Sequence, residues 1–434
     1  MSKESGPGAF PPQLSTATVD AKTSIHLLFW KIQVYGVAVI TFFSFSPALV
    51  HLQEYIFLFL LAAVVGISGV DRVIPWVKTS IDIPIGCFVM WVLCTVPFAT
   101  DVSYSFVEWR KFITHVLAFY WASVVFQKQT QSHWQSLMFG AVLAGGLCLT
   151  FYAMSDFFLQ GGSWRYSRGF RAGAPSSDYN WLSTYLVLVL PLFIAGWFVY
   201  RDWWVRLVIA LSLVLGAMAQ MASYTRAGWL AHAAQGFGFG FVHRRRQFMF
   251  VLIGICLLIG LFTQINIPGW RETDTLNPWT LEARFSVWKL GLADIRDHPF
   301  VGVGYGNDTF VKRHQEYVHE AQLFKDEQAR VLPSMHSTFL MVALGSGLPA
   351  FATFVWIFVA IIRRLVVIKK IDLHTDIGVL SLAIGMAVLG FAVRNGFDYM
   401  FAGSMSYLFW ILVAYGFALR NVQPLGRSDS EVHS

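Results

Sequence analysis

Long apolar runs dominate this chain and constrain its fold more than any other feature. A membrane-spanning helix needs roughly 20 apolar residues, and about twelve runs meet that requirement. They are continuously apolar, unlike the alternating strands of a membrane barrel. Of the 434 residues, 56% are hydrophobic and only 13% are charged. The sequence therefore predicts an all-α polytopic membrane protein with spans near residues 27–49, 54–70, 82–99, 112–127, 135–155, 181–200, 205–222, 227–242, 248–267, 337–362, 376–396 and 403–420.

Polar segments divide the chain into five parts. Residues 1–26 are rich in Pro and Gly and lack the apolar core of a secretory signal, so we predict a disordered cytoplasmic tail. Transmembrane helices 1–9 occupy residues 27–267, and a folded loop follows at 268–335. Transmembrane helices 10–12 occupy residues 336–420, and residues 421–434 form a second cytoplasmic tail.

The distribution of basic loops predicts the orientation of the chain. Short Lys- and Arg-rich connections are expected on the cytoplasmic side of a membrane protein. Placing both termini there puts the basic connections at 71–78, 127–134, 200–206, 243–247 and 363–370 inside. The loop 156–180 and the long segment 268–335 then lie on the outer face.

The preference for basic residues on the cytoplasmic side does not explain the arginines on the predicted outer face. Arg165, Arg168 and Arg171 recur every three residues in one outer loop, and Arg226 stands alone at the outer start of a span. Each could extend to lipid headgroups. As a set they favour a site that binds an anion.

The long outer segment is predicted to form a helical lid over the membrane domain. Its acidic and basic residues nearly balance. Asn277 and Pro278 suit a helix start, and a helix to about residue 297 would place one apolar stripe on a single face: Leu281, Phe285, Trp288, Leu292 and Ile295. A glycine turn and a second helix, to about Arg330, complete the lid.

Two motifs in this segment have ordinary structural explanations. Gly302, Gly304 and Gly306 follow a predicted helix and not a strand, so a tight turn is favoured over nucleotide binding. Four possible metal ligands lack the spacing of a known site, and a solvated helix face is favoured: His314, Glu316, His319 and Glu320. We therefore expect no metal, no cofactor and no nucleic-acid partner.

His336 begins the tenth span. Ser334 is a candidate N-cap, which would place His336 in the first helical turn, where the helix dipole favours a neutral imidazole. A neutral imidazole can accept a proton from a hydroxyl group. The alternative is an interfacial histidine bonded to a loop carbonyl.

A pair of ionisable residues lies near the outer end of the eleventh predicted span. Arg394 and Asp398 are four residues apart and can pair across one helical turn. Charged groups at membrane depth are candidates for function. A purely structural pair remains the alternative.

Three segments resemble the O-antigen ligase family. "HSTFLMVALGSGLPA" (336–350) is similar to its signature of His, then Asn, Ser or Gln, nine residues, and Gly-x-x-Gly, with Ala350 in place of the last glycine. "ARFSVWKLGLADIRDHPFVGVGYGN" (283–307) and "SYTRAGW" (223–229) resemble segments of the wider superfamily of ligases, O-antigen polymerases and O-oligosaccharyltransferases.

The resemblance implies a membrane-embedded, lipid-dependent glycosyltransferase in the bacterial inner membrane, with its active site facing the periplasm. Such an enzyme transfers O-antigen from undecaprenyl diphosphate to the lipid A-core oligosaccharide during lipopolysaccharide biosynthesis, without a metal or nucleotide sugar. His336 matches the family's proposed base. Arg226 and Arg284 match arginines thought to hold the donor diphosphate, while Arg165, Arg168, Arg171, Arg394 and Asp398 are further candidates for substrate binding.

Three other functions remain open at this point. An O-antigen polymerase shares the lipid-linked donor, and the match at His336 and Ser337 favours the ligase. A protein O-oligosaccharyltransferase usually carries a sizeable soluble C-terminal domain, whereas only a short polar segment follows the last predicted span. A flippase or other transporter of lipid-linked glycan would show charged or broken helices at the membrane midplane and internal repeats, and neither is evident.

Overall fold

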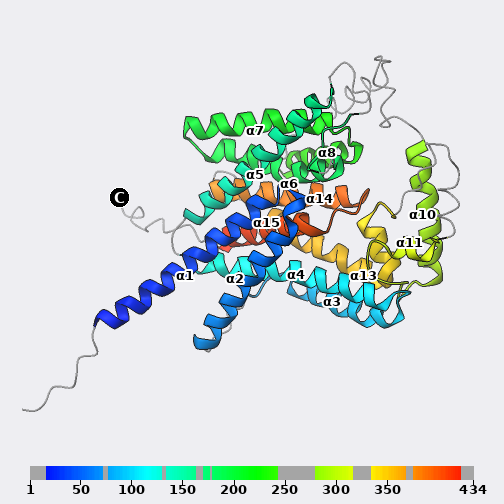
Figure 1. The fold of residues 1–434 in the computed structure, drawn as a ribbon, viewed down its shortest axis with the longest axis horizontal. Coiled ribbons are helices and arrows are strands. Elements are labelled where there is room, and N and C mark those ends of the chain that lie inside the picture. The colour runs from blue at the N-terminus through cyan, green and yellow to red at the C-terminus, as the bar shows by residue number, and fades with distance from the viewer. Residues whose placement is uncertain are drawn as a thin grey trace, which may run out of the picture.

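The computed structural model describes residues 16–71, 77–129, 133–162, 170–175, 178–242, 279–315, 334–367 and 375–421. Within these ranges the regular structure is helical, apart from an isolated bridge between Ala174 and Asp178. The long helices form one bundle, with two helices set across one end (Figure 1).

The described helices are α1 (Thr16–Phe43), α2 (Val50–Asp71), α3 (Asp82–Thr95), α4 (Val102–Gln127), α5 (His133–Leu159), α6 (Tyr179–Val199), α7 (Trp203–Ala222), α8 (Arg226–Val242), α10 (Trp279–Asp297), α11 (Thr309–Arg313), α13 (Thr338–Ile362), α14 (Asp376–Asn395) and α15 (Gly403–Asn421). Apart from α10 and α11, each described helix overlaps one of the predicted spans. Among the described residues, seven helices are long and apolar enough to cross a membrane. The all-α polytopic class is confirmed; the number twelve stays a prediction, and the ninth predicted span lies outside the described residues.

The predicted disordered tail is wrong in its second half. Helix α1 begins at Thr16, inside the range 1–26. After Pro12 the sequence contains no proline or glycine before the apolar run, so nothing stops the helix from extending backwards. Residues 1–15 and 422–434 lie outside the described residues.

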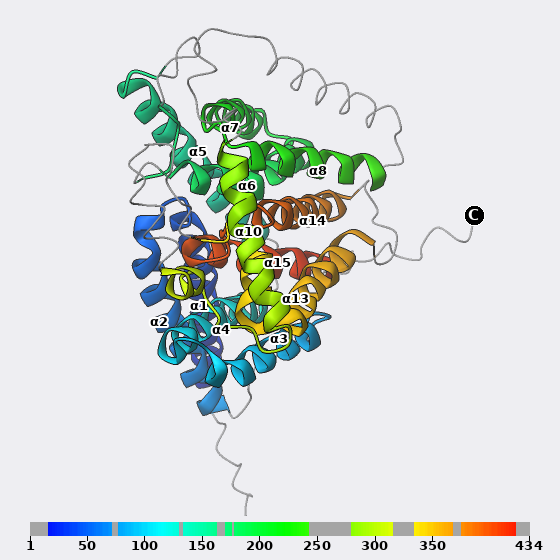
Figure 2. The same ribbon diagram turned by 90° about the vertical axis from the view of Figure 1, so that its right-hand side faces the viewer.

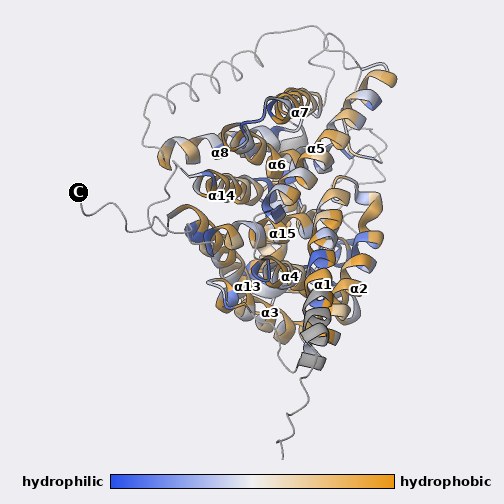
Figure 3. Ribbon diagram, turned by 90° about the vertical axis from the view of Figure 1, so that its left-hand side faces the viewer, coloured by the Kyte–Doolittle hydropathy of each residue, from blue (hydrophilic) through white to orange (hydrophobic). Residues whose placement is uncertain are grey.

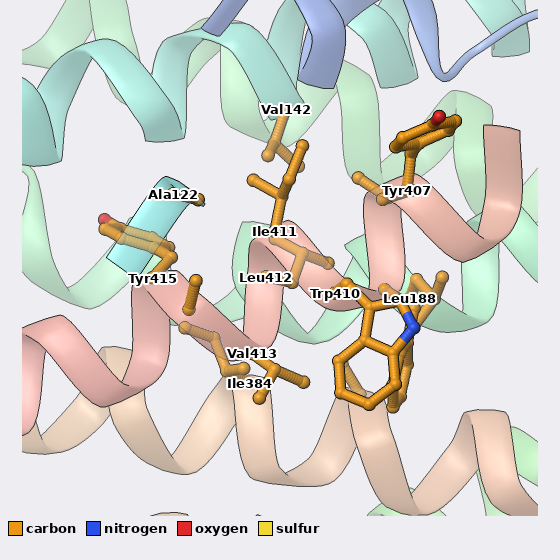
Figure 4. Packing of buried hydrophobic residues seen from close by; sticks show 14 of the residues in the cluster. Ala122, Val142, Leu188, Ile384, Tyr407, Trp410, Ile411, Leu412, Val413 and Tyr415 are labelled. Atoms are coloured by element: carbon orange, nitrogen blue, oxygen red, sulfur yellow. The ribbon is translucent and has the colours of Figure 1, made fainter. Parts of the chain in front are cut away.

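Helix α15 runs through the centre of the bundle. It is buried along almost its whole length, and its aromatic side chains pack against neighbouring helices (Figure 4). Large apolar residues elsewhere face outwards: Phe59, Phe151 and Phe198 are all exposed. Hydrophobic residues cover much of the surface of the long helices (Figure 3). This distribution is the one expected of helices that contact lipid.

Helix α13 is broken near its middle. Ser346 and Gly347 leave the helical conformation, and Gly347 adopts φ 80°. The glycine turn that follows α10 fills the break: Val303 N donates to Leu344 O at 2.9 Å, and Leu348 N donates to Pro299 O at 2.7 Å. The predicted structural role of the glycine turn is therefore confirmed.

Helices α10 and α11, with the glycine turn between them, form the lid, here defined as residues 279–315. Helix α10 crosses the end of the bundle (Figure 2). Trp288 Nε1 donates to Met335 O at 2.7 Å, and Val287 and Ile295 are buried beside it. The predicted stripe is partly wrong, because Phe285 and Leu292 are exposed. The helix instead turns the face around Gly291 inwards, where Met335 fills the space that a larger side chain would need.

An acidic residue joins the two lid helices. Asp294 accepts a hydrogen bond from Arg313 Nε at 2.9 Å and lies 2.7 Å from His314 Nε2. The second lid helix was predicted to run to about Arg330; α11 ends at Arg313, where His314 caps it, and the predicted remainder lies almost entirely outside the described residues. Residues 316–333, which include the other suggested metal ligands, lie outside the described residues.

Candidate functional site

His336 lies at the lid end of the bundle, immediately before α13. Its backbone adopts φ 45°, a left-handed conformation that few non-glycine residues take. The helix therefore begins after His336. Ser337 is the N-cap and accepts a hydrogen bond from Leu340 N at 3.3 Å. The predicted cap at Ser334 is wrong, because its hydroxyl instead accepts from His336 N at 3.2 Å.

The His336 ring contacts a carboxylate in the connection between α14 and α15. Its Nδ1 lies 3.2 Å from Asp398 Oδ1, and Asp398 is only 4% exposed. An ionised carboxylate only accepts hydrogen bonds, so this contact assigns the proton to Nδ1. The Nε2 atom is buried and has no hydrogen-bond partner among the described residues. It therefore carries a lone pair that can accept a proton.

Arg394 completes this chain of contacts. Its Nη2 lies 3.2 Å from Asp398 Oδ2 and 2.9 Å from Asn180 Oδ1. The predicted pairing of Arg394 with Asp398 is confirmed, although α14 ends at Asn395, before Asp398. The Arg394 side chain is fully buried, and its Nε and Nη1 have no partner within the described parts of the chain.

Asp398 is held in place and kept ionised by its surroundings. Burial raises the pKa of Asp398, but the hydrogen bond from His336 and the charges of two nearby arginines outweigh it. The net result is a pKa well below the ordinary value of 3.8. Its backbone is fixed as well, because Thr338 N donates to Asp398 O at 3.1 Å.

The lid brings another arginine to this site. Arg284 is half-buried on α10, and burial lowers the pKa of its guanidinium; attraction to Asp398 opposes this shift, while repulsion by Arg394 adds to it. Arg226, the first residue of α8, repels Arg284 in turn. Arg394 and Arg284 thus both act on the Asp398 carboxylate, and Arg226 lies close enough to Arg284 to repel it. This excess of positive charge favours binding of an anion.

Arg171 lies at the edge of the same cluster. Its guanidinium stacks 3.5 Å from the centre of the Tyr179 ring, and its Nε donates to Ser223 O at 2.9 Å. Tyr179 also interacts electrostatically with Arg284. Of the three predicted loop arginines, the structure therefore connects Arg171 to the cluster. The other two, Arg165 and Arg168, lie outside the described residues.

Sequence reasoning missed one contact and one member of the cluster. It did not pair His336 with Asp398, and it did not single out Asn180, the partner of Arg394. Asn180 stands at the start of an apolar run, where polar residues are common, so its position carries no distinctive signal. Only the packing of α6 against α14 brings it to Arg394.

The fold and the cluster together define an all-α polytopic membrane protein with a buried, arginine-rich ionisable site beneath a helical lid. The model of the O-antigen ligase family matches residues 211–355. The matched segment contains Arg226, Arg284 and His336. The resemblance expected from the sequence is thereby confirmed, and with it an enzyme of the ligase or polymerase type in O-antigen processing. No curated protein matches the chain.

Proposed function

We propose that this protein is an O-antigen ligase that transfers a glycan from undecaprenyl diphosphate to the lipid A-core oligosaccharide. The observation that carries the proposal is the His336–Asp398 contact, which leaves Nε2 available beside a group of arginines. A base next to cationic groups suits a reaction in which a hydroxyl attacks and a diphosphate leaves. The acceptor hydroxyl and the donor diphosphate are the two groups such a site must hold.

In the proposed reaction His336 acts as general base. Its Nε2 takes the proton of the acceptor hydroxyl while that oxygen forms a bond to the anomeric carbon of the donor glycan. The bond from that carbon to the diphosphate oxygen breaks, and the lipid diphosphate leaves with the electron pair, which inverts the anomeric centre. Asp398 orients the ring and stabilises the imidazolium, as a buried carboxylate does in other catalytic histidine pairs.

We assign the leaving diphosphate to the arginines. Arg226 and Arg284 converge from α8 and the lid, and arginine binds phosphate oxygens bidentately while staying charged. Their charge would stabilise the negative charge that develops on the leaving oxygens. Arg394 offers two more N–H groups without partners among the described residues. Arg165, Arg168 and Arg171 would draw in the anionic donor or the phosphorylated core.

The proposal includes a location and an orientation. We place the protein in the bacterial inner membrane, with both termini cytoplasmic and the site facing the periplasm, where lipid-linked O-antigen and lipid A-core meet. The match to the O-antigen ligase family supports the membrane location, and the basic connections assigned to the inside from the sequence support the orientation.

A reconstituted transfer assay tests the function. Purified protein, undecaprenyl diphosphate-linked glycan and lipid A-core are mixed, and the joined product is measured. We expect His336→Gln to reduce the rate at least about 100-fold, the size of a general-base contribution. Arg284→Lys should also lose most activity, since lysine cannot bind bidentately. Chelation of divalent metals with EDTA should leave the rate unchanged.

His298→Gln is a matched control, because His298 lies on the lid but outside the cluster. A His336→Gln enzyme that worked at the wild-type rate would refute the assignment of the base. A product in which donor glycans are joined to each other would indicate an O-antigen polymerase, and glycan attached to protein would indicate an O-oligosaccharyltransferase. Movement of glycan across a liposome membrane without any bond formation would indicate a flippase.

A further inference from the structure

A polar cavity lies at the end of the bundle opposite His336. It has a volume of about 200 Å³ and is formed by the segment before α3 and by the last turns of α4, α13 and α15. His336 and Asp398 precede the first turns of α13 and α15. Since these helices contain 25 and 19 residues, a rise of 1.5 Å per residue separates the two sites by roughly 30 Å. The cavity therefore lies at the other surface of the membrane.

Positive charge gathers at this cavity. Lys78 and Arg364 line it, and the charge of Arg364 is repelled by that of Arg420. Arg364 Nη2 donates to Asn421 Oδ1 at 2.9 Å, a neutral acceptor. None of the ion pairs formed by the described residues involves Lys78 or Arg364. Within the part of the chain that the structure describes, the cavity is therefore electropositive and has no paired acid.

The acidic residue nearest in sequence is committed elsewhere. Asp82 accepts a hydrogen bond from Thr79 N at 2.9 Å and from the Tyr120 hydroxyl at 2.8 Å. Its carboxylate thereby holds the start of α3 against α4. Among the described residues it forms no ion pair with Lys78 or Arg364.

The cavity also contains an unused buried hydroxyl. Ser123 lines the cavity and is only 4% exposed, and its Oγ has no hydrogen-bond partner among the described residues. A buried polar group without a hydrogen-bond partner is uncommon in a folded protein, so this hydroxyl is available to bind a ligand. Ser80 adds a further hydroxyl group to the lining, while the Thr79 hydroxyl donates to Asp82 Oδ1. Together these donors suit a tetrahedral oxyanion.

One wall of the cavity is apolar. Val77, Phe417 and Ala418 line it, and all three are buried. A site that combines cationic groups and hydroxyls with an apolar wall, at the membrane surface between helices, matches the two parts of a phospholipid. The phosphate would meet the polar groups, and the glycerol and first acyl carbons would meet the apolar wall.

We propose that this cavity binds the phosphate headgroup of an anionic phospholipid in the leaflet opposite the His336 site. The cationic groups and hydroxyl groups that line the cavity suit a phosphate group. The apolar wall and the position at the membrane surface favour a lipid over a free anion. This site is separate from the proposed transfer reaction and does not depend on it.

Native mass spectrometry of the full-length protein in detergent tests the proposal. Binding of phosphatidylglycerol is titrated and compared with phosphatidylcholine and with inorganic phosphate. We expect the wild type to prefer phosphatidylglycerol, and the double variant Lys78→Gln/Arg364→Gln to bind it at least about tenfold more weakly. Ser123→Ala keeps both charges and should weaken binding by about threefold, the effect of one neutral hydrogen bond.

The matched control is Lys31→Gln/Arg201→Gln, which removes two exposed positive charges that do not line the cavity. It should keep the wild-type affinity. Thermal unfolding in lipid-free detergent checks that each variant is folded, and Ser123→Ala provides a second test should the double variant unfold. Equal binding of phosphatidylglycerol by the double variant and the wild type would overturn the proposal. So would displacement of the lipid by millimolar inorganic phosphate, which would assign the cavity to a soluble anion.

Discussion

Asp398 is the residue on which the charges of the candidate site depend. It contacts His336 with one oxygen and Arg394 with the other, and both Asp398 and Arg394 are buried. A buried ion pair contributes little net stability, but removing one partner leaves the other charge uncompensated. The structural cost of changing Asp398 should therefore come mainly from Arg394.

We predict that Asp398→Asn destabilises the protein by about 3 kcal/mol, the lower end of the range for breaking a buried pair. Thermal unfolding in detergent measures the change. Asp297→Asn is the control, since Asp297 is exposed on α10 and forms no described ion pair. An Asp398→Asn protein as stable as the control would show that Arg394 finds its countercharge elsewhere.

The low pKa of Asp398 predicts a defined dependence of stability on pH. A carboxyl group whose pKa is lower in the folded state stabilises the fold above its ordinary pKa, 3.8 here. That contribution is lost as the pH falls from this value through the lower folded-state pKa. The difference in melting temperature between wild type and Asp398→Asn should stay constant from pH 7 to about 5. It should shrink only in stronger acid; a difference that disappears near neutral pH would contradict the assigned ion pair.

At the scale of elements, the break in α13 joins the lid to the bundle. The segment 336–350, which resembles the family signature, contains both His336 and Gly347. It therefore contributes to the candidate site and to the docking of the lid. A Cβ on Gly347 would lie 2.1 Å from Phe300 O, and its φ of 80° with ψ 176° is accessible to glycine alone. Ala350, which replaces the last glycine of the family signature, lies in regular helix and is fully buried. The departure from the signature therefore falls where a side chain is tolerated.

We predict that Gly347→Ala destabilises the protein by more than about 2 kcal/mol, because backbone strain adds to the clash with the glycine turn. It should also reduce transfer by displacing Arg284 on the lid. Ala350→Gly is the control, with an expected loss of only about 1 kcal/mol from helix propensity. Thermal unfolding and the transfer assay measure both variants. Equal effects of the two changes would contradict the assigned role of Gly347.

At the scale of the whole molecule, the lid lies across one end of the bundle (Figure 1). The His336–Asp398 contact lies at that end, and the cavity proposed to bind lipid lies at the other. The predicted even number of spans would put both termini on one side of the membrane, and the predicted inner position of the basic connections makes this the side away from the lid. We predict that, in a variant without native cysteines, Lys289→Cys on the exposed lid surface reacts with an impermeant thiol reagent in cells with a permeable outer membrane. Ser5→Cys and Ser430→Cys should react only after lysis. Labelling of only one terminus before lysis would contradict the predicted even number of spans, and labelling of both would contradict the predicted orientation.

The sequence predicted the local features well because their signals are local. The length of the apolar runs indicated membrane helices, and the four-residue spacing of Arg394 and Asp398 indicated their pairing. Helix ends were less predictable. Ser334 and Ser337 are both good caps by residue type, and the left-handed backbone of His336 decided between them. The inward face of α10 was also mispredicted, because Gly291 allows a close approach that a hydrophobic stripe does not reveal.

By itself, the sequence determined that this chain is a helical membrane protein and that His336, Arg226 and Arg284 carry the family pattern. Only the tertiary structure decided that His336 lies against Asp398, 62 residues away, and that Arg394 is held by Asn180, 214 residues away. The physical reason is that hydrophobic length and helical spacing act within one segment. The contacts that set charge and proton position depend on how separate helices pack.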